Sequence, residues 1–161
     1  MTAFNSILAV QGAGTAQDAV VAEAVRLARD NAAVLTVVDV IEADEPPQDA
    51  VAVRRARLAE ALAEGGVDLL QIETMSSLEE VEAAANAARA TGLPVFATMT
   101  FDTAGRSMMG ITPEDYAGYA RKLGLNGFGA NCGIGPAELL HSVTGFGEGG
   151  EQMIIAKGNC G

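Results

Sequence analysis

The stretch GVDLLQIETMSSLEEVEAAANAARATGLPVFATMTF, residues 66–101, contains the pattern that decides the fold. An apolar run, Val67–Glu73, is followed by an alanine-rich stretch and then by a second apolar run, Pro94–Thr100. The alanine-rich stretch begins with Ser77 and Glu80, which have the spacing of a helix capping box. Residues 66–101 therefore predict a strand, a helix and a second strand, the unit from which parallel sheets are built.

The same alternation of apolar runs and helical stretches continues on both sides of this unit. Thr112 and Pro113 predict the start of a further helix, and Gly124 predicts its end. Gly135 and Pro136 predict the start of a last short helix. The expected strands are Ser6–Gln11, Val34–Val40, Val67–Glu73, Pro94–Thr100, Asn126–Asn131 and Gln152–Lys157. We therefore expect an α/β fold with one open, mainly parallel six-stranded sheet and helices on both faces, as in Rossmann and flavodoxin folds.

Length, composition and charge exclude several classes of protein. A chain of 161 residues, of which 49% are hydrophobic, suits one domain with a single core. No apolar run approaches the roughly 20 residues of a membrane span, and residues 1–5 lack the basic start of a secretory signal, so a cytoplasmic protein is expected. A net charge of -11 repels phosphate backbones and anionic lipids, so neither nucleic acid nor a membrane is an expected partner.

Polar residues gather where the predicted strands end. Glu73, Asn131 and Asn159 end or closely follow strands, and Cys132 comes directly after Asn131. Ligands of parallel sheets and barrels bind beyond the carboxyl ends of the strands, so these residues are candidates for a site. Each also has a structural interpretation: Glu73 as a helix cap, Cys132 as a small buried hydrophobe and the asparagines as turn formers. His141, the only histidine, is expected to be a helix residue without a catalytic role.

Four motifs, in the right order, resemble those of the homocysteine S-methyltransferase family. GVDLLQIETM, residues 66–75, resembles the fourth-strand motif of that family, and FDTAGR, residues 101–106, resembles the loop after strand five. GANCG, residues 129–133, and AKGNCG, residues 156–161, resemble the ends of strands six and seven. The resemblance covers about residues 53–161 and implies that this segment derives from a (β/α)8 barrel.

The resemblance implies functional roles for several of the candidate residues. Glu73 would bind the ammonium group of homocysteine, Asn131 and Asn159 would contribute to substrate binding, and Cys132 would be the first of three thiolate ligands of zinc. Zinc held by thiolates keeps a substrate thiol deprotonated near neutral pH. The other two zinc ligands belong to a motif after strand eight that this sequence does not contain, because Cys160 belongs to the strand-seven motif. We therefore expect an incomplete zinc site, no cofactor, and no catalysis by the chain alone, with a homocysteine-like molecule as its partner.

The N-terminal part resembles a different family, the universal stress proteins. FNSILAV, residues 4–10, the helical stretch after it and VLTVVDV, residues 34–40, resemble the opening βαβ unit of that family. Gln11 stands where the family usually has an Asp that helps to bind an adenine nucleotide. Residues 43–49, with their acids and two prolines, form the expected seam. The chain would then be a chimera that forms a single domain, 1–161, from segments 1–50 and 51–161.

The sequence leaves three functions open. The first is a domain derived from a homocysteine S-methyltransferase and catalytically incomplete. The alternative is a nucleotide-binding module of the universal-stress type, and the third is a scaffold without a ligand. A homo-oligomer formed through exposed sheet edges is also left open. The strand order is the most informative single observation. Neighbouring placement of the last three strands would preserve the geometry of the parent barrel, whereas an inserted N-terminal strand would separate Cys132 from Asn159.

Overall fold

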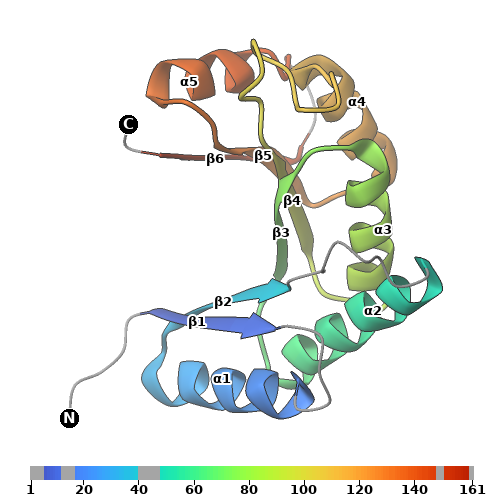
Figure 1. The fold of residues 1–161 in the computed structure, drawn as a ribbon, viewed down its shortest axis with the longest axis vertical. Coiled ribbons are helices and arrows are strands. Elements are labelled where there is room, and N and C mark those ends of the chain that lie inside the picture. The colour runs from blue at the N-terminus through green and yellow to red at the C-terminus, as the bar shows by residue number, and fades with distance from the viewer. Residues whose placement is uncertain (1–5, 12–16, 40–47, 148–150, 160–161) are drawn as a thin grey trace. The chain divides into compact units, whose positions relative to one another are not determined.

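The computed structural model describes residues 6–11, 17–39, 48–147 and 151–159 of the chain (Figure 1). Two compact units are present, Met1–Asp68 and Leu69–Gly161. Each unit has a parallel sheet of its own, with two strands in the first and four in the second. Within the described residues, no helix is both long enough and apolar enough to cross a membrane.

In the first unit, two strands alternate with two helices along the chain. Strand β1 (Ser6–Gln11) pairs in parallel with β2 (Val34–Asp39) along its whole length. Helix α1 (Gln17–Asn31) packs against both strands and against α2 (Gln48–Glu64). The buried face of α1 carries apolar residues at helical spacing, namely Val21, Ala24, Val25 and Ala28. The predicted βαβ unit is therefore present, while most of the expected seam lies outside the described residues.

The second unit has its strands in the order in which they occur in the sequence, β3-β4-β5-β6, and all pairs are parallel. The strands are β3 (Leu70–Met75), β4 (Val95–Met99), β5 (Gly127–Cys132) and β6 (Met153–Gly158). The connecting helices are α3 (Leu78–Arg89), α4 (Pro113–Leu123) and α5 (Pro136–Thr144). The last three strands are thus neighbours, which is the order that keeps the predicted strand-end residues together.

Local signals in the sequence fix the starts and ends of these helices. Ser77 and Glu80 form the predicted capping box, in which the Glu80 amide donates to Ser77 Oγ over 3.2 Å. Thr112 caps α4 by accepting a hydrogen bond of 3.1 Å from the Asp115 amide. Gly124 ends α4 in the left-handed conformation with a φ of 66°, which glycine adopts at low cost. These three predictions are confirmed.

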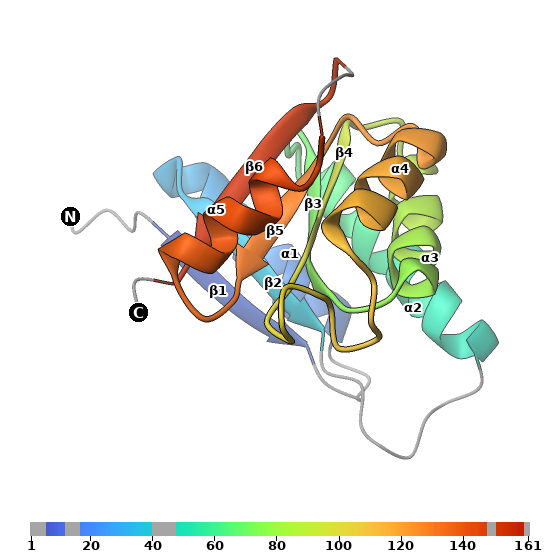
Figure 2. The same ribbon diagram turned by 90° about the horizontal axis from the view of Figure 1, so that it is seen from above.

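An aromatic cluster forms the core of the second unit on the helix side of its sheet. Tyr116 of α4 and Phe128 of β5 meet edge to face with 6.0 Å between ring centroids, and Phe101 and Phe146 complete the cluster. The Tyr116 hydroxyl donates a hydrogen bond of 2.7 Å to the Ala97 carbonyl, which ties α4 to β4. Helix α3 lies against β3 and β4, α4 lies against α3 and β5, and α5 lies against β5 and β6 (Figure 2). The helices of this unit therefore cover one face of the sheet.

The α/β class and the parallel pairing are confirmed, whereas the single six-stranded sheet is not confirmed. The strands form a sheet of two in the first unit and a sheet of four in the second. The helices of the second unit lie on one face rather than on both. An alternating pattern of strands and helices predicts that neighbours run parallel, but it contains no information on which strands exchange hydrogen bonds.

Candidate functional site

The candidate site lies at the carboxyl ends of β3, β5 and β6. Because the four parallel strands follow one another in order, their carboxyl ends meet at one edge of the sheet. Glu73 lies near the end of β3, Cys132 ends β5, and Asn159 directly follows β6. The structure thus brings together the strand-end residues that the sequence singled out.

A bulge in β3 shapes the first part of this edge. The register between β3 and β4 shifts between Ile72 and Met75, so the β3 segment between them holds one residue more than its partner. Thr74 lies in this bulge, and its backbone is in the left-handed region with a φ of 64°. Cys132, at the end of β5, is also left-handed, with a φ of 58°. Residues other than glycine adopt this conformation at a cost of about 1–2 kcal/mol and cluster at functional sites, so the surrounding contacts must hold them there.

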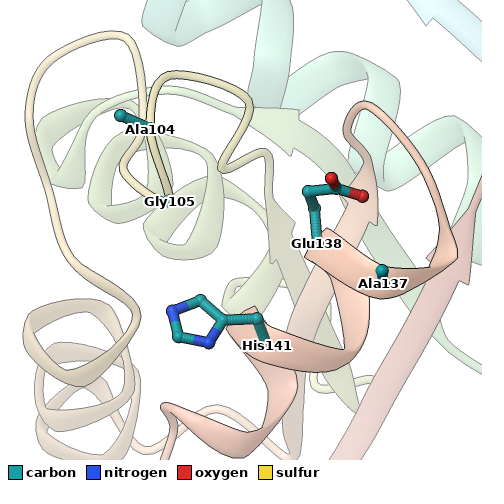
Figure 3. A pocket seen from close by; sticks show the side chains of 5 residues that line it. All are labelled: Ala104, Gly105, Ala137, Glu138 and His141. Atoms are coloured by element: carbon teal, nitrogen blue, oxygen red, sulfur yellow. The ribbon is translucent and has the colours of Figure 1, made fainter.

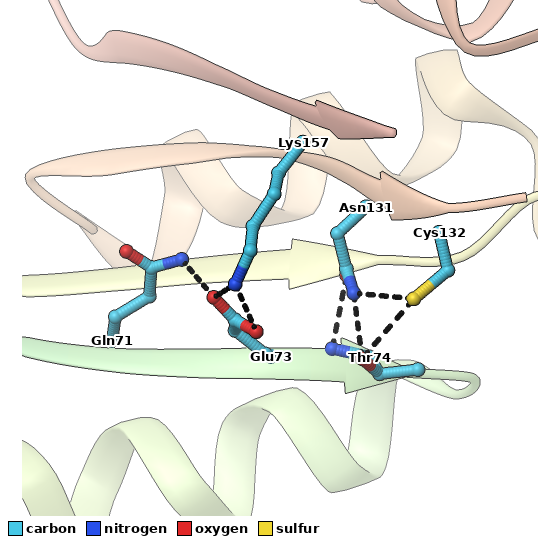
Figure 4. Close-up of polar contacts among 6 residues, drawn as sticks. All are labelled: Gln71, Glu73, Thr74, Asn131, Cys132 and Lys157. Carbon is cyan, nitrogen blue, oxygen red and sulfur yellow. Dashed lines mark hydrogen bonds and ion pairs between the residues drawn. The ribbon is translucent and has the colours of Figure 1, made fainter. Parts of the chain in front are cut away.

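Asn131 supplies those contacts. Its side chain, only 2% exposed, accepts a hydrogen bond of 3.0 Å from the Thr74 amide and donates one of 2.6 Å to Thr74 Oγ1. Its Nδ2 also lies 3.1 Å from Cys132 Sγ (Figure 4). One buried amide therefore holds both left-handed residues across the end of β4. The Asn131 side chain, predicted to bind substrate, is engaged by protein groups.

Glu73 lies on the face of the sheet opposite the helices and is engaged by two neighbours. Lys157 of β6 places its Nζ 2.8 Å from Glu73 Oε1 and 3.0 Å from Oε2. Gln71, two residues before Glu73, donates to Oε1 over 2.7 Å (Figure 4). The carboxylate predicted to bind an ammonium group is thus paired with the ammonium group of a lysine.

The loops beyond the strand ends are tied to one another. Asn159 donates a hydrogen bond of 3.2 Å to the Gly133 carbonyl, which joins the end of β6 to the turn after Cys132. Ser107, fully buried, donates to the Ser76 carbonyl over 2.7 Å and fixes the loop after β4 against the loop after β3. The edge of the sheet is therefore held together by side chains as well as by strand pairing.

His141 belongs to a separate, shallow pocket. This pocket has a volume of about 370 Å³ and is open to solvent, with the imidazole and the Glu138 carboxylate on one side and the turn at Ala104 and Gly105 on the other (Figure 3). The placement of His141 on α5 agrees with its interpretation as a helix residue.

No cluster of three His, Cys, Asp or Glu side chains able to hold a metal ion occurs in the described residues.

Sequence reasoning missed three residues of the site, namely Gln71, Thr74 and Lys157. Gln71 precedes Glu73 by two positions, and strand alternation alone would have placed both on one face. Lys157 is one of only two lysines in the chain and lies in the last predicted strand, in register with Asn131. Thr74 follows Glu73 at the same polar strand end, but its bulge gave no signal, since a bulge depends on the pairing between two strands.

The fold and this edge define an α/β protein with a candidate small-molecule site at the carboxyl ends of its strands. The sequence matches the homocysteine S-methyltransferase family over residues 4–161, so the match includes the first βαβ unit. The chain belongs to the homocysteine S-methyltransferase family.

Two known proteins illustrate the relationship. Methionine synthase from Mycobacterium tuberculosis (strain ATCC 25618 / H37Rv) is 32% identical over an alignment of 82 residues that covers 47% of this chain and 7% of that protein. The crystal structure of the homocysteine methyltransferase MmuM from Escherichia coli, in its apo form, has a similar fold with a TM-score of 0.65 and 22% identity. That similarity covers 88% of this chain and 60% of MmuM. The chain thus spans only part of the length of either relative.

Proposed function

We propose that the chain binds homocysteine at the carboxyl ends of β3, β5 and β6. The observation that carries the proposal is the meeting of a carboxylate, a thiol and an amide at one edge, from Glu73, Cys132 and Asn159. In this proposal Glu73 binds the ammonium group, Asn159 lies near the amino-acid end, and Cys132 lies near the sulfur. Asn131 then acts as a positioning residue, because its amide already holds Thr74 and Cys132.

The described residues do not fit a zinc site by themselves. Zinc in a catalytic site takes three protein ligands, and the described part of this edge supplies one thiolate, Cys132. We propose that the chain alone binds the amino acid without transferring a methyl group to it. The chimeric origin and the cytoplasmic location stay predictions, and the homo-oligomer that the sequence left open stays a possibility to be tested.

Calorimetric titration with L-homocysteine tests the proposed binding. Glu73→Gln removes the carboxylate charge and is expected to weaken binding by at least about tenfold, the lower end of what a hydrogen bond to a charged group contributes. Glu60→Gln, an equal change on the exposed surface of α2, is the matched control and should leave the affinity unchanged. Absence of homocysteine binding by the unaltered chain would overturn the proposal.

A second assay tests the absence of turnover. The chain is incubated with homocysteine and, separately, betaine, S-methylmethionine and methylcobalamin as methyl donors, and methionine is measured. No methionine is expected above the level of a sample without protein. Robust turnover with any donor would show that the chain is catalytically complete.

A further inference from the structure

Lys157 forms an ion pair that links the two outer strands of the four-stranded sheet. Its Nζ contacts both carboxylate oxygens of Glu73, at 2.8 and 3.0 Å, although 84 residues separate the two in sequence. Glu73 lies on β3 and Lys157 on β6, the two outer strands of the four-stranded sheet. The ion pair therefore spans β4 and β5 across the face opposite the helices (Figure 4).

The residues between the outer strands leave room for this span. Gly129 of β5 is paired with Thr98 of β4, and strand alternation places both on the face of Lys157. A Cβ atom at Gly129 would lie 1.8 Å from the Ile155 carbonyl oxygen, so the closeness of the backbones excludes a side chain there. The charged groups of Glu73 and Lys157 therefore extend over a part of the sheet where the side chains are absent or small.

The ion pair is exposed on the side of Lys157 and partly exposed on the side of Glu73. The Lys157 side chain is 62% exposed and that of Glu73 is 32% exposed. Exposed ion pairs contribute about 0–1 kcal/mol to the free energy of unfolding. Stabilisation of the fold therefore does not account for a lysine at this position. A ligand that has a positive and a negative group can separate the pair, because it offers each of the two side chains a group of opposite charge.

Thr98 provides a second, independent sign of a ligand on this face. The residue is fully buried, yet its Oγ1 has no hydrogen-bond partner in the described part of the structure. Buried hydroxyl groups are almost always hydrogen-bonded, so an exception needs an explanation. A carboxylate bound over the middle of the sheet would accept the hydrogen bond that Thr98 Oγ1 is free to donate.

We propose that Lys157 determines specificity by releasing Glu73 when the substrate binds and taking the carboxylate of the amino acid. This inference rests on the proposed function, because it needs Glu73 to bind the ammonium group of homocysteine. The ammonium and carboxylate groups of an α-amino acid are attached to one carbon. A site that recognises both groups therefore needs a negatively charged and a positively charged side chain next to each other. Glu73 and Lys157 supply such partners, and the site selects zwitterionic amino thiols over simple thiols.

Three thiols that differ in a single charged group test the proposal by calorimetric titration. L-homocysteine has both groups, aminopropanethiol lacks the carboxylate, and mercaptobutanoate lacks the ammonium. Lys157→Met keeps the apolar length of the side chain and removes its charge. Lys122→Met alters the only other lysine, which is exposed on α4 on the helix side of the sheet, and is the matched control.

The expected result is a change in selectivity. In Lys157→Met the preference for homocysteine over aminopropanethiol should fall by at least about tenfold, and mercaptobutanoate should also bind more weakly. Lys122→Met should leave all three affinities unchanged. An unaltered preference in Lys157→Met, or tighter homocysteine binding, would show that Lys157 only competes for Glu73 and would overturn the inference.

The titrations separate this failure from a failure of the proposed function. If the unaltered chain binds homocysteine, and Glu73→Gln weakens that binding while Lys157→Met does not change the selectivity, only the role of Lys157 is wrong. If the unaltered chain binds none of the three thiols, the proposed function is wrong and the inference falls with it. Thermal unfolding of each variant checks that the exposed substitutions leave the fold intact.

Discussion

Replacing Asn131 by alanine tests how the edge of the sheet is held together. The substitution removes two hydrogen bonds to Thr74 and the contact of 3.1 Å with Cys132 Sγ. Each hydrogen bond contributes about 1 kcal/mol, and the exposed Thr74 recovers part of its loss by binding water. We therefore expect Asn131→Ala to lower the free energy of unfolding by about 2 kcal/mol.

Thermal and urea unfolding measure this loss. For a chain of this length, about 2 kcal/mol corresponds to a fall in Tm of roughly 4–8 °C. Asn86→Ala is the matched control, because Asn86 is exposed on α3 and alanine is the better helix former. That variant should be at least as stable as the unaltered chain.

A double-mutant cycle decides whether the loss comes from the proposed contact. Thr74→Ala removes the hydroxyl that Asn131 Nδ2 reaches at 2.6 Å, and it is combined with Asn131→Ala. We expect a coupling free energy of about 1 kcal/mol between the two substitutions. Strictly additive effects, or an Asn131→Ala variant as stable as Asn86→Ala, would refute the bridging role of Asn131.

Three further predictions concern packing, pH and metal. Gly129→Ala would place a Cβ atom 1.8 Å from the Ile155 carbonyl oxygen, and it should destabilise the fold by about 3 kcal/mol in urea unfolding. Gly118→Ala meets no atom within 4 Å in α4 and should instead stabilise by about 0.5–1 kcal/mol. Burial raises the pKa of Tyr116, so the folded state retains a proton that the unfolded state loses, and stability should fall as the pH rises above about 10. Tyr116→Phe should reduce the loss of stability above about pH 10. An unchanged loss of stability in this variant would show that Tyr116 does not cause it. Protein purified without chelator should hold no stoichiometric zinc by elemental analysis, whereas tightly held zinc that disappears in Cys132→Ser would contradict the incomplete site.

The types of the elements and the limits of several helices could be predicted because they depend on neighbouring residues. The capping box at Ser77 and the left-handed end of α4 at Gly124 are set by hydrogen bonds and backbone preferences within one turn. The candidate positions Glu73 and Cys132 followed from a general property of parallel sheets, whose strand ends meet at one edge.

The partners of those residues could not be predicted in the same way. Asn131 and Thr74 are 57 residues apart, and Glu73 and Lys157 are 84 apart, so no local pattern joins them. The bulge that turns Thr74 toward Asn131 exists only in the pairing between β3 and β4.

The sequence by itself determined the succession of strands and helices, the parallel α/β class and the positions of the polar strand ends. The tertiary structure alone decided the division into sheets of two and four strands, the bridge made by Asn131 and the pairing of Glu73 with Lys157. The physical reason is that secondary structure depends on interactions between residues close in sequence. Strand pairing, bulges and contacts across a sheet depend on which distant segments the folded chain brings within hydrogen-bond distance.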